Sequence, residues 1–329
     1  MSTKIYYIQP PQAKPYGKGD GSSLANSWNG WSSIDWDKVS TGDILQVSGT
    51  HNNTGARFAA LSVKKPGVTI RGSKAVFDRY YFDFEGISNI TWDSLKFTNS
   101  GQFQAPGAKS IVIKNCWFNG LDPSNDHFIR LYPGNDDWVL DNTLVENSGT
   151  GLYSIIDLVG HAPSAQRITV KNCHFRNIGT KEHPHQDGHA IGIQEGCGHK
   201  ISNVWTENTG EAISFWARST EKMTDITVDS CKVETVHKEK NTDGHGIVIS
   251  GSHDSTLPKA GWRSNIKITN NNVANTDGNA IRSNIRDKIV ITGNHVQKYG
   301  LAGEYKDPIF LLNPFGPTDN SGVKNNTVS

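Results

Sequence analysis

The sequence lacks a long apolar run, an excess of charge of either sign and a dense cysteine pattern. No stretch approaches the roughly 18 consecutive apolar residues that a membrane-spanning helix needs, so no membrane segment is expected. Lysine and arginine total 33 against 32 acidic residues. This balance excludes a nucleic-acid binder that works by neutralising many phosphates, and it excludes an acidic disordered tail. Motifs for phosphate cradling (GxxxxGK), a serine nucleophile (GxSxG) and a zinc protease (HExxH) are absent too.

The chain also lacks a CxxC pair and any Cys/His spacing typical of zinc, although it has four cysteines. Its first residues contain no apolar signal core. We expect either a protein made without a leader or one whose leader was removed and replaced by a methionine.

What the sequence does contain is a repeat of alternating apolar and polar residues that ends in Asn, Asp or Ser. The third positions of its copies are Ile70, Trp92, Ile113, Leu140, Val170, Ile201, Val228, Ile268, Ile291 and Val323. The shortest steps are 21 and 22 residues, from Trp92 to Ile113 and from Ile70 to Trp92. Alternation has the period of a strand, and a constant minimum step indicates a coil of fixed size that carries loops.

A second apolar segment lies between the copies. Its central residues are Ile129, Ile156, Ile191, Ile213, Ile247, Ile281 and Ile309. Two or three short strands per turn of ~22 residues, with glycine and asparagine at the corners, predict an all-β parallel β-helix (a solenoid) of about ten coils. We expect residues 1–66 to form an N-terminal strand and cap region leading into the first coils, and residues 67–329 to form one continuous β-helix domain.

The repeat gives the cysteines and several asparagines a structural interpretation. Cys116, Cys173 and Cys231 share one repeat position in alternate coils, which separates them by roughly 9–10 Å, beyond disulfide reach. We expect free thiols that point inward, with Cys197 at a corner. A neighbouring position predicts a ladder of stacked side-chain amides, made of Asn115, Asn142, Asn172, Asn203 and Asn270.

Candidate chemistry lies two residues before each central isoleucine. That column reads His127, Ser154, His189, Glu211, His245, Asn279 and Asp307. If no coil is missed, Glu211 lies between His189 and His245, each about 4.8 Å away. A carboxylate beside a histidine fixes its tautomer and raises its pKa, as acid–base catalysis requires. The alternative is that these polar groups only satisfy backbone amides at the corner.

Outward positions and loop insertions add further candidates around this group. We expect the catalytic residues to be His189, Glu211, His245, Arg218 and Arg282, and the substrate-binding residues to be Trp216, Tyr132, Arg130, Gln194, His185 and Lys240. Aromatic faces stack on sugar rings, and arginine binds carboxylates with two parallel hydrogen bonds. Asp187 and Asp243 each precede Gly-His; they either form turns or share a Ca²⁺ ion between neighbouring coils.

The opening of the chain resembles that of the pectin-lyase-like superfamily of right-handed parallel β-helix proteins. The similar segments are KIYYIQ, GDGSS and GDILQVSGTH, at residues 4–9, 19–23 and 42–51, and the resemblance extends over nearly the whole chain. It implies a right-handed coil and a polysaccharide bound along an elongated groove. It also implies a secreted or extracellular protein, or alternatively part of a phage virion. We expect no nucleic-acid or membrane partner and no required cofactor, with calcium as an option.

The resemblance leaves three functions open. The first is a polysaccharide lyase on a uronate-containing glycan, in which Arg218 or Arg282 neutralises the carboxylate, His189 or His245 is the base, and Tyr132 or a second histidine is the acid. A C5-epimerase would use the same neutraliser and base. The second is a glycoside hydrolase with two carboxyls drawn from Glu211, Asp187, Asp243 and Asp157. The third is a glycan-binding or phage receptor-binding module without catalysis.

Overall fold

The structure is a computed structural model. It describes residues 2–55, 57–121, 127–154, 164–184, 188–217, 222–238, 242–250, 262–283, 288–303, 307–311 and 322–329.

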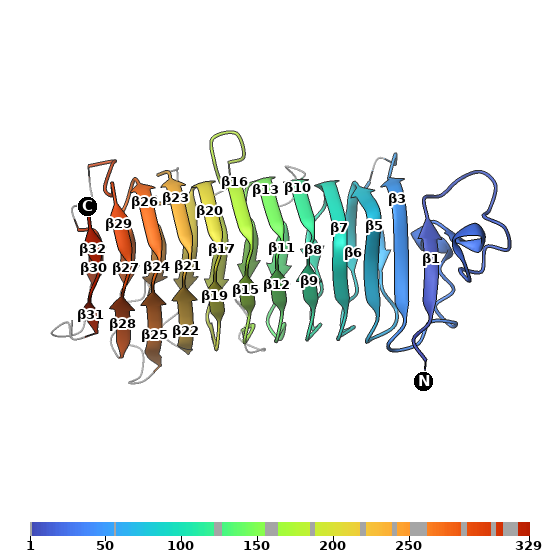
Figure 1. The fold of residues 1–329 in the computed structure, drawn as a ribbon, viewed down its shortest axis with the longest axis horizontal. Coiled ribbons are helices and arrows are strands. Elements are labelled where there is room, and N and C mark those ends of the chain that lie inside the picture. The colour runs from blue at the N-terminus through green and yellow to red at the C-terminus, as the bar shows by residue number, and fades with distance from the viewer. Residues whose placement is uncertain are drawn as a thin grey trace.

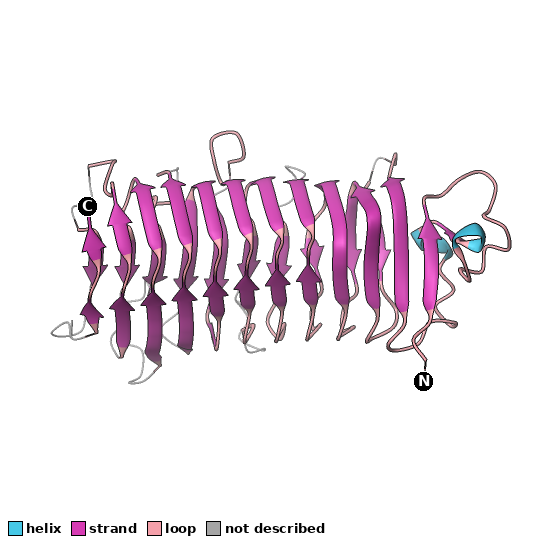
Figure 2. Ribbon diagram, viewed as in Figure 1, coloured by secondary structure: helices cyan, strands magenta, loops and turns pink. Residues whose placement is uncertain are grey.

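Strands stack along one long axis, with the N terminus at one end of the molecule and the C terminus at the other (Figure 1). In the described part of the chain every strand pairing is parallel, in one sheet of 22 strands and one of 10. The helical elements described there are two 3-10 turns near the N terminus, Leu24–Asn26 and Trp31–Ser33 (Figure 2). No helix in these residues is long and apolar enough to cross a membrane. The predicted all-β parallel β-helix is therefore confirmed.

The larger sheet contains the repeat copies. Its first row of strands is β1 (Ile5–Gln9), β3 (Ile44–Asn52), β5 (Thr69–Asp78), β7 (Thr91–Ser100), β9 (Val112–Lys114), β12 (Val139–Asp141), β15 (Thr169–Lys171), β19 (Lys200–Ser202), β22 (Met223–Asp229), β25 (Arg263–Thr269), β28 (Ile289–Thr292) and β31 (Val323–Lys324). In the coils that come after β7, a corner separates each first-row strand from a second strand. These second strands form the second row: β10 (Trp117–Leu121), β13 (Leu144–Ser148), β16 (His174–Ile178), β20 (Trp205–Thr209), β23 (Lys232–Val236), β26 (Asn272–Thr276), β29 (His295–Gln297) and β32 (Thr327–Val328). Two short strands, β2 (Trp28–Asn29) and β18 (Gly196–Cys197), complete it.

The smaller sheet contains the second apolar segments, and its outer face carries the candidate site. Its strands are β4 (Ala59–Ser62), β6 (Tyr80–Asp83), β8 (Phe103–Gln104), β11 (Ile129–Leu131), β14 (Leu152–Ser154), β17 (His189–Gln194), β21 (Glu211–Trp216), β24 (Ile247–Ser250), β27 (Ile281–Ser283) and β30 (Ile309–Leu311). Each strand pairs with the strand of the next coil.

The register of the repeat agrees with the sequence at every step. Each predicted third-position residue pairs with the next one, from Ile70 with Trp92 to Ile291 with Val323. The ladder also continues toward the N terminus, because Tyr6 pairs with Leu45 and Leu45 with Ile70. The parallel ladder thus already includes residues 5–9 and 44–52.

Inward side chains of successive coils stack into one continuous core. Its N-terminal part is aromatic: Phe77, Phe97 and Phe118 stack at centroid distances of 5.8 and 4.8 Å. The predicted inward thiols are confirmed, since Cys116, Cys173 and Cys231 are free and buried. Burial raises the pKa of each of these thiols to about 12, so they are unreactive at neutral pH.

Corner side chains link the coils through amide and carboxylate ladders. The predicted outer ladder forms, although aspartates share it: Asn142 Nδ2 donates to Asn115 Oδ1 at 2.8 Å, whereas Asn172 Nδ2 donates to Asp141 Oδ1 at 2.8 Å. Asn115 and Asn142 have φ of 55° and 46°, a left-handed conformation that asparagine tolerates well.

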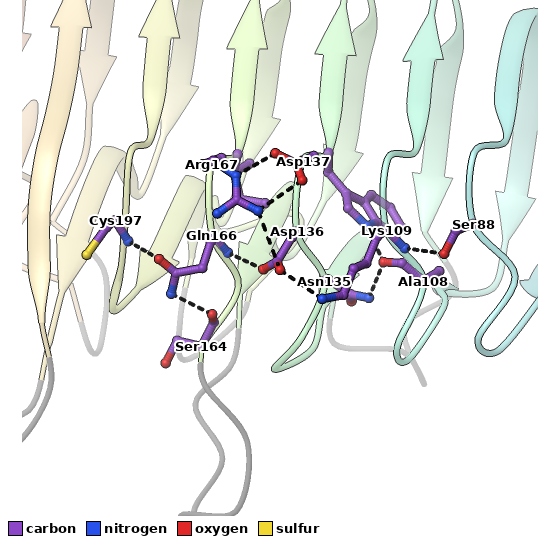
Figure 3. A network of polar contacts seen from close by, with 12 residues as sticks. Ser88, Ala108, Lys109, Asn135, Asp136, Asp137, Ser164, Gln166, Arg167 and Cys197 are labelled. Atoms are coloured by element: carbon purple, nitrogen blue, oxygen red, sulfur yellow. Dashed lines mark hydrogen bonds and ion pairs between the residues drawn. The ribbon is translucent and has the colours of Figure 1, made fainter.

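A different corner uses backbone amides as the donors. Cys197 N–H donates to Gln166 Oε1 at 2.8 Å, Gln166 N–H to Asp136 Oδ1 at 3.1 Å, and Lys109 N–H to Ser88 Oγ at 2.9 Å (Figure 3). In each of these three bonds the side chain of one coil satisfies a backbone amide of the next coil.

One predicted strand was wrong. The sequence placed Ile156 at the centre of the fourth coil's second strand, but the strand is β14 and Leu152 pairs with both Ile129 and Ile191. The reason lies at Gly151, where a Cβ atom would come within 2.4 Å of the Ala190 carbonyl oxygen and 2.9 Å of the Phe175 ring. Glycine allows this close approach and determines the register, so Thr150 takes the column position predicted for Ser154.

Candidate active site

A pocket of about 370 Å³ lies on the outer face of the smaller sheet, over β14, β17, β21, β24 and β27. Its lining includes six of the residues predicted from sequence: His189, Glu211, His245, Arg282, Trp216 and Gln194. Asp243, proposed as a metal ligand, lines it as well. Residues that lie up to 129 positions apart in the sequence (153 to 282) therefore share one pocket because the coils stack in register.

A break in strand alternation turns His189 and Glu211 outward. The two residues pair directly across β17 and β21, and the next paired residues are Ile191 and Ile213. Ala190 and Ile191 are both fully buried, so two consecutive side chains point into the core. Strict alternation from Ile191 would have placed His189 inside. The break instead places it on the same face as the pocket-lining Gly192 and Gln194.

His189 and Glu211 form a closely coupled pair at the floor of the pocket. Nδ1 of His189 lies 2.8 Å from Oε2 of Glu211, and the two side chains are 16% and 11% exposed. Burial would raise the pKa of Glu211, but the charge and hydrogen bond of His189, and then the charge of His245, outweigh it and lower that pKa. Glu211 is therefore ionised at neutral pH. When the imidazole of His189 is neutral, this carboxylate favours the tautomer that carries its proton on Nδ1, which leaves Nε2 as the acceptor.

His245 is held in the opposite tautomer. Its Nδ1 accepts the backbone N–H of Asn279 at 2.8 Å, and a backbone amide can only donate, so the neutral ring carries its proton on Nε2. Burial is the main cause that lowers the pKa of His245, and Arg282 lowers it further, while Glu211 and Asp243 act in the opposite direction. His245 is thus a neutral hydrogen-bond donor rather than a base.

Nε2 of His245 belongs to a small cluster with Asp243 and Arg282. The carboxylate oxygen Oδ2 of Asp243 lies 3.4 Å from Nε2 and 3.2 Å from Nη1 of Arg282. Nη1 and Nε2 are themselves 2.8 Å apart, and the carboxylate that accepts from both holds the two donors together. Arg282 is therefore ion-paired with Asp243 at the end of the pocket opposite to His189.

Tyr153 belongs to the site but was missed by sequence reasoning. Its ring stacks between His127 and His189 at centroid distances of 4.6 and 5.8 Å, and Nε2 of Gln194 donates to its hydroxyl. The shifted register of the fourth coil hid it. A small residue before the inward aliphatic residue, as in Ala190–Ile191 and Ala212–Ile213, would have identified Gly151–Leu152 and hence Tyr153.

Two further predicted residues that the structure describes lie outside the pocket. Arg130 pairs with Tyr153 on the next coil but does not line the pocket. Tyr132, predicted as a proton donor, lies outside the pocket and donates its hydroxyl proton to Oε1 of Gln104 at 2.7 Å. The predictions for His185, Asp187, Arg218, Lys240 and Asp157 lie outside the described residues.

Comparison with known proteins shows similarity of structure only, since no family model and no curated protein matches the sequence. A rhamnogalacturonan lyase superposes with a TM-score of 0.54 at 12% identity, covering 90% of this chain and 74% of the other. The Agl-KA catalytic domain gives 0.52 at 14% identity, covering 88% and 63%. An alginate lyase from Paenibacillus sp. str. FPU-7 gives 0.49 at 17% identity, covering 84% and 93%.

Structures that match include a pectate lyase, an α-1,3-glucanase, a surface adhesin of Streptococcus pneumoniae and a tailspike. The two structures with TM-scores above 0.5, the rhamnogalacturonan lyase and the Agl-KA catalytic domain, are only 12% and 14% identical to this chain, so they show a shared fold and no more.

Proposed function

We propose that the protein is a polysaccharide lyase that cleaves a uronate-containing glycan by β-elimination in the pocket over β14–β27. One observation carries the proposal. Ionised Glu211 lies 2.8 Å from Nδ1 of His189, and this leaves Nε2 of His189 as a base in a pocket that also holds the Arg282 guanidinium. A base and a cation are what removal of a proton next to a carboxylate requires.

In the proposed reaction, the uronate carboxylate displaces the Asp243 carboxylate from Arg282 and from the Nε2–H of His245, and these two donors then withdraw charge from C5. His189 Nε2 takes the C5 proton, and the electron pair of that C–H bond forms a double bond between C4 and C5. The bond from C4 to the glycosidic oxygen breaks. The oxygen leaves with the bonding pair and takes up a proton. Glu211 stabilises the imidazolium that forms on His189.

Tyr153 is our candidate for the group that protonates the leaving oxygen. Its hydroxyl oxygen accepts a hydrogen bond from Nε2 of Gln194, and a tyrosine hydroxyl can donate its proton as well as accept. Its ring lies against His189, which places the acid and the base on adjacent coils. Trp216 at the pocket wall offers an aromatic face for a sugar ring.

A glycoside hydrolase is the second candidate, because Glu211 and Asp243 both line the pocket. A hydrolase needs one carboxyl of its pair protonated, and the lowered pKa of Glu211 argues against that residue as the acid. A C5-epimerase would share the base and the cation with the lyase and differ only in returning a proton to C5.

Product analysis separates these candidates. The protein is incubated with pectate, alginate, a glycosaminoglycan and a neutral glucan, while ultraviolet absorbance of the unsaturated product and new reducing ends are both followed. We expect absorbance and reducing ends to rise together on one of the uronate glycans. Reducing ends without absorbance would replace the lyase with a hydrolase, and exchange of the C5 proton without cleavage would replace it with an epimerase.

Repeating the assay with a chelator tests the calcium proposed for Asp187 and Asp243. Secretion and the virion alternative remain predictions.

A further inference from the structure

A second pocket, of about 320 Å³, lies on the same outer face nearer the N terminus, over β4, β6 and β8. We define the distal site as its lining residues Arg57, Phe58, Tyr81, Gln102 and Gln104, together with Gly101. The order of the smaller sheet, β17-β14-β11-β8-β6-β4, puts this site in line with the candidate active site along the solenoid axis (Figure 1). The proposed reaction uses none of these residues.

Two buried polar donors in this region have no acceptor among the residues that the structure describes. Nε2 of Gln102 is buried and has no hydrogen-bond partner among the residues that the structure describes. The same holds, within those residues, for Nε of Arg130, which lies on β11 between the two pockets. A buried donor without an acceptor is costly, typically by about 1–3 kcal/mol, so a ligand that offers acceptor oxygens would relieve both groups.

The chemistry of the distal site fits an acidic sugar. Tyr81 and Phe58 supply partly exposed aromatic rings, which pack against the apolar faces of sugar rings. Arg57 is exposed at the rim, and the lining contains no carboxylate. Asp83 on β6 pairs with Gln104 on β8, but Asp83 is exposed and does not line the pocket. Donors and a cation without a matching anion favour a ligand that carries carboxylates.

A continuous row of side chains joins the two pockets. Gln104 pairs with Arg130 in register, Arg130 with Tyr153, and Tyr153 with Gly192 beside the catalytic pair. Tyr132 bridges the first step through its hydrogen bond to Gln104, and the guanidinium of Arg130 lies 5.2 Å above its ring. Three strand spacings of about 4.8 Å separate Gln104 from Gly192, roughly 14 Å, which an oligosaccharide spans and one sugar does not.

We propose that the distal site binds a uronate residue several sugars away from the bond that is cleaved, and so makes the protein select long acidic chains over short ones. This inference rests on the proposed function for the identity of the chain. It adds a second, non-catalytic contact, in which Arg57 and Gln102 bind a sugar carboxylate and Tyr81 packs against the ring.

The test uses uronate oligosaccharides of defined length, from dimers to octamers of galacturonate and of mannuronate. The variant R57A/Q102M removes the cation and the unpaired donor while keeping the side-chain length at residue 102. K200A is the matched control, because Lys200 is an exposed cation on β19 of the other sheet. KM and kcat are measured for each length. Octamer binding is measured by calorimetry in the His189→Ala background, where cleavage is silenced.

We expect R57A/Q102M to raise KM and the octamer Kd about tenfold, with kcat and the dimer KM unchanged, and K200A to match the parent. Equal effects on dimers and octamers, or no effect on either, would overturn the distal site while leaving the lyase intact. If no glycan is cleaved but octamers bind and R57A/Q102M weakens them, the distal site stands and the lyase fails. Octamers that do not bind at all would refute the distal site.

Discussion

Each imidazole of the pocket takes its proton state from one fixed contact. The Glu211 carboxylate holds the proton of His189 on Nδ1, while the Asn279 amide forces the proton of His245 onto Nε2. Two histidines in one column therefore have different roles, one as acceptor and one as donor. The sequence predicted their proximity from strand register. It could not predict the tautomer of His245, because that depends on a backbone amide whose direction no side-chain pattern reveals.

Removing the charge of Glu211 tests the base directly. We expect Glu211→Gln to lower kcat by about 100-fold or more, because a neutral amide neither selects the Nδ1–H tautomer nor stabilises the imidazolium. Glu207→Gln is the matched control. Glu207 also faces a histidine, with its Oε2 at 3.3 Å from Nε2 of His174, but it lies on β20 of the other sheet. Full activity in Glu211→Gln, with circular dichroism unchanged, would remove His189 from the base role.

Buried histidines make stability depend on pH. Burial lowers the pKa of His51 and His199 to about 4, from an ordinary value near 6.5. Between these values the unfolded chain binds protons that the folded chain does not, so stability is full above about pH 6.5 and falls as the pH drops toward 4. We expect a loss of about 2 kcal/mol per histidine between roughly pH 6.5 and pH 5, measured as the urea midpoint. His199→Gln should reduce this slope, and equal midpoints at the two pH values would contradict the prediction.

Within the elements, glycine and alanine decide how each strand enters the smaller sheet. Ala190 and Ala212 occupy an inward corner position that precedes an inward isoleucine, and Gly151 does so in the fourth coil. The sequence predicted most of these strands from their apolar alternation. It failed at the fourth coil because Ile156 and Leu158 give a stronger alternation signal than Leu152, whereas steric fit at Gly151 determines the register. Tyr153 could not be found without that correction.

Gly192 lies beneath the ring of Tyr153 and tests its position. A Cβ atom at residue 192 would come within 2.5 Å of Cδ2 of Tyr153, so Gly192→Ala should displace the ring from His189. We expect kcat to fall about tenfold or more while the fold is kept. Tyr153→Phe serves as the reference, and the double variant should be no slower than Tyr153→Phe alone, because both changes act on the same hydroxyl. Additive losses would mean that Gly192→Ala acts by another route.

Across the whole molecule, the interior changes composition along the axis. The column that holds Cys116, Thr143, Cys173 and Cys231 continues as asparagine in the last coils, at positions 271, 294 and 326. These amides are bonded to one another and to backbone carbonyls; Nδ2 of Asn294, for example, donates to Ile268 O and to Asn326 Oδ1, both at 2.9 Å. The repeat pattern in the sequence predicted only the outer asparagine ladder. Aligning the cysteine position across all copies would have found the inner ones.

This inner ladder leads to a prediction about how the solenoid unfolds. In the structure, Oδ1 of Asn294 accepts hydrogen bonds from the backbone N–H and the side-chain Nδ2 of Asn271, both at 2.9 Å, and Nδ2 of Asn294 donates to the Ile268 carbonyl. Asn294→Leu removes all three of these hydrogen bonds. Buried unsatisfied groups cost about 1–3 kcal/mol each, so we expect a local loss of 3 kcal/mol or more. Cys231→Ala, in the same column, should cost only about 1 kcal/mol.

Because each coil contacts only its neighbours, the loss should stay near its origin. In hydrogen exchange, Asn294→Leu should deprotect the strands from β25 to β32 while β5, β7 and β10 keep their protection. The aromatic N-terminal core and the distal site would then remain folded. Binding of uronate octamers should weaken only to the extent that β24 and β27, which lie under the candidate active site, lose their protection. Uniform deprotection along the chain would show instead that the solenoid unfolds as one cooperative unit, and that a substitution far from the pocket acts on it through global stability.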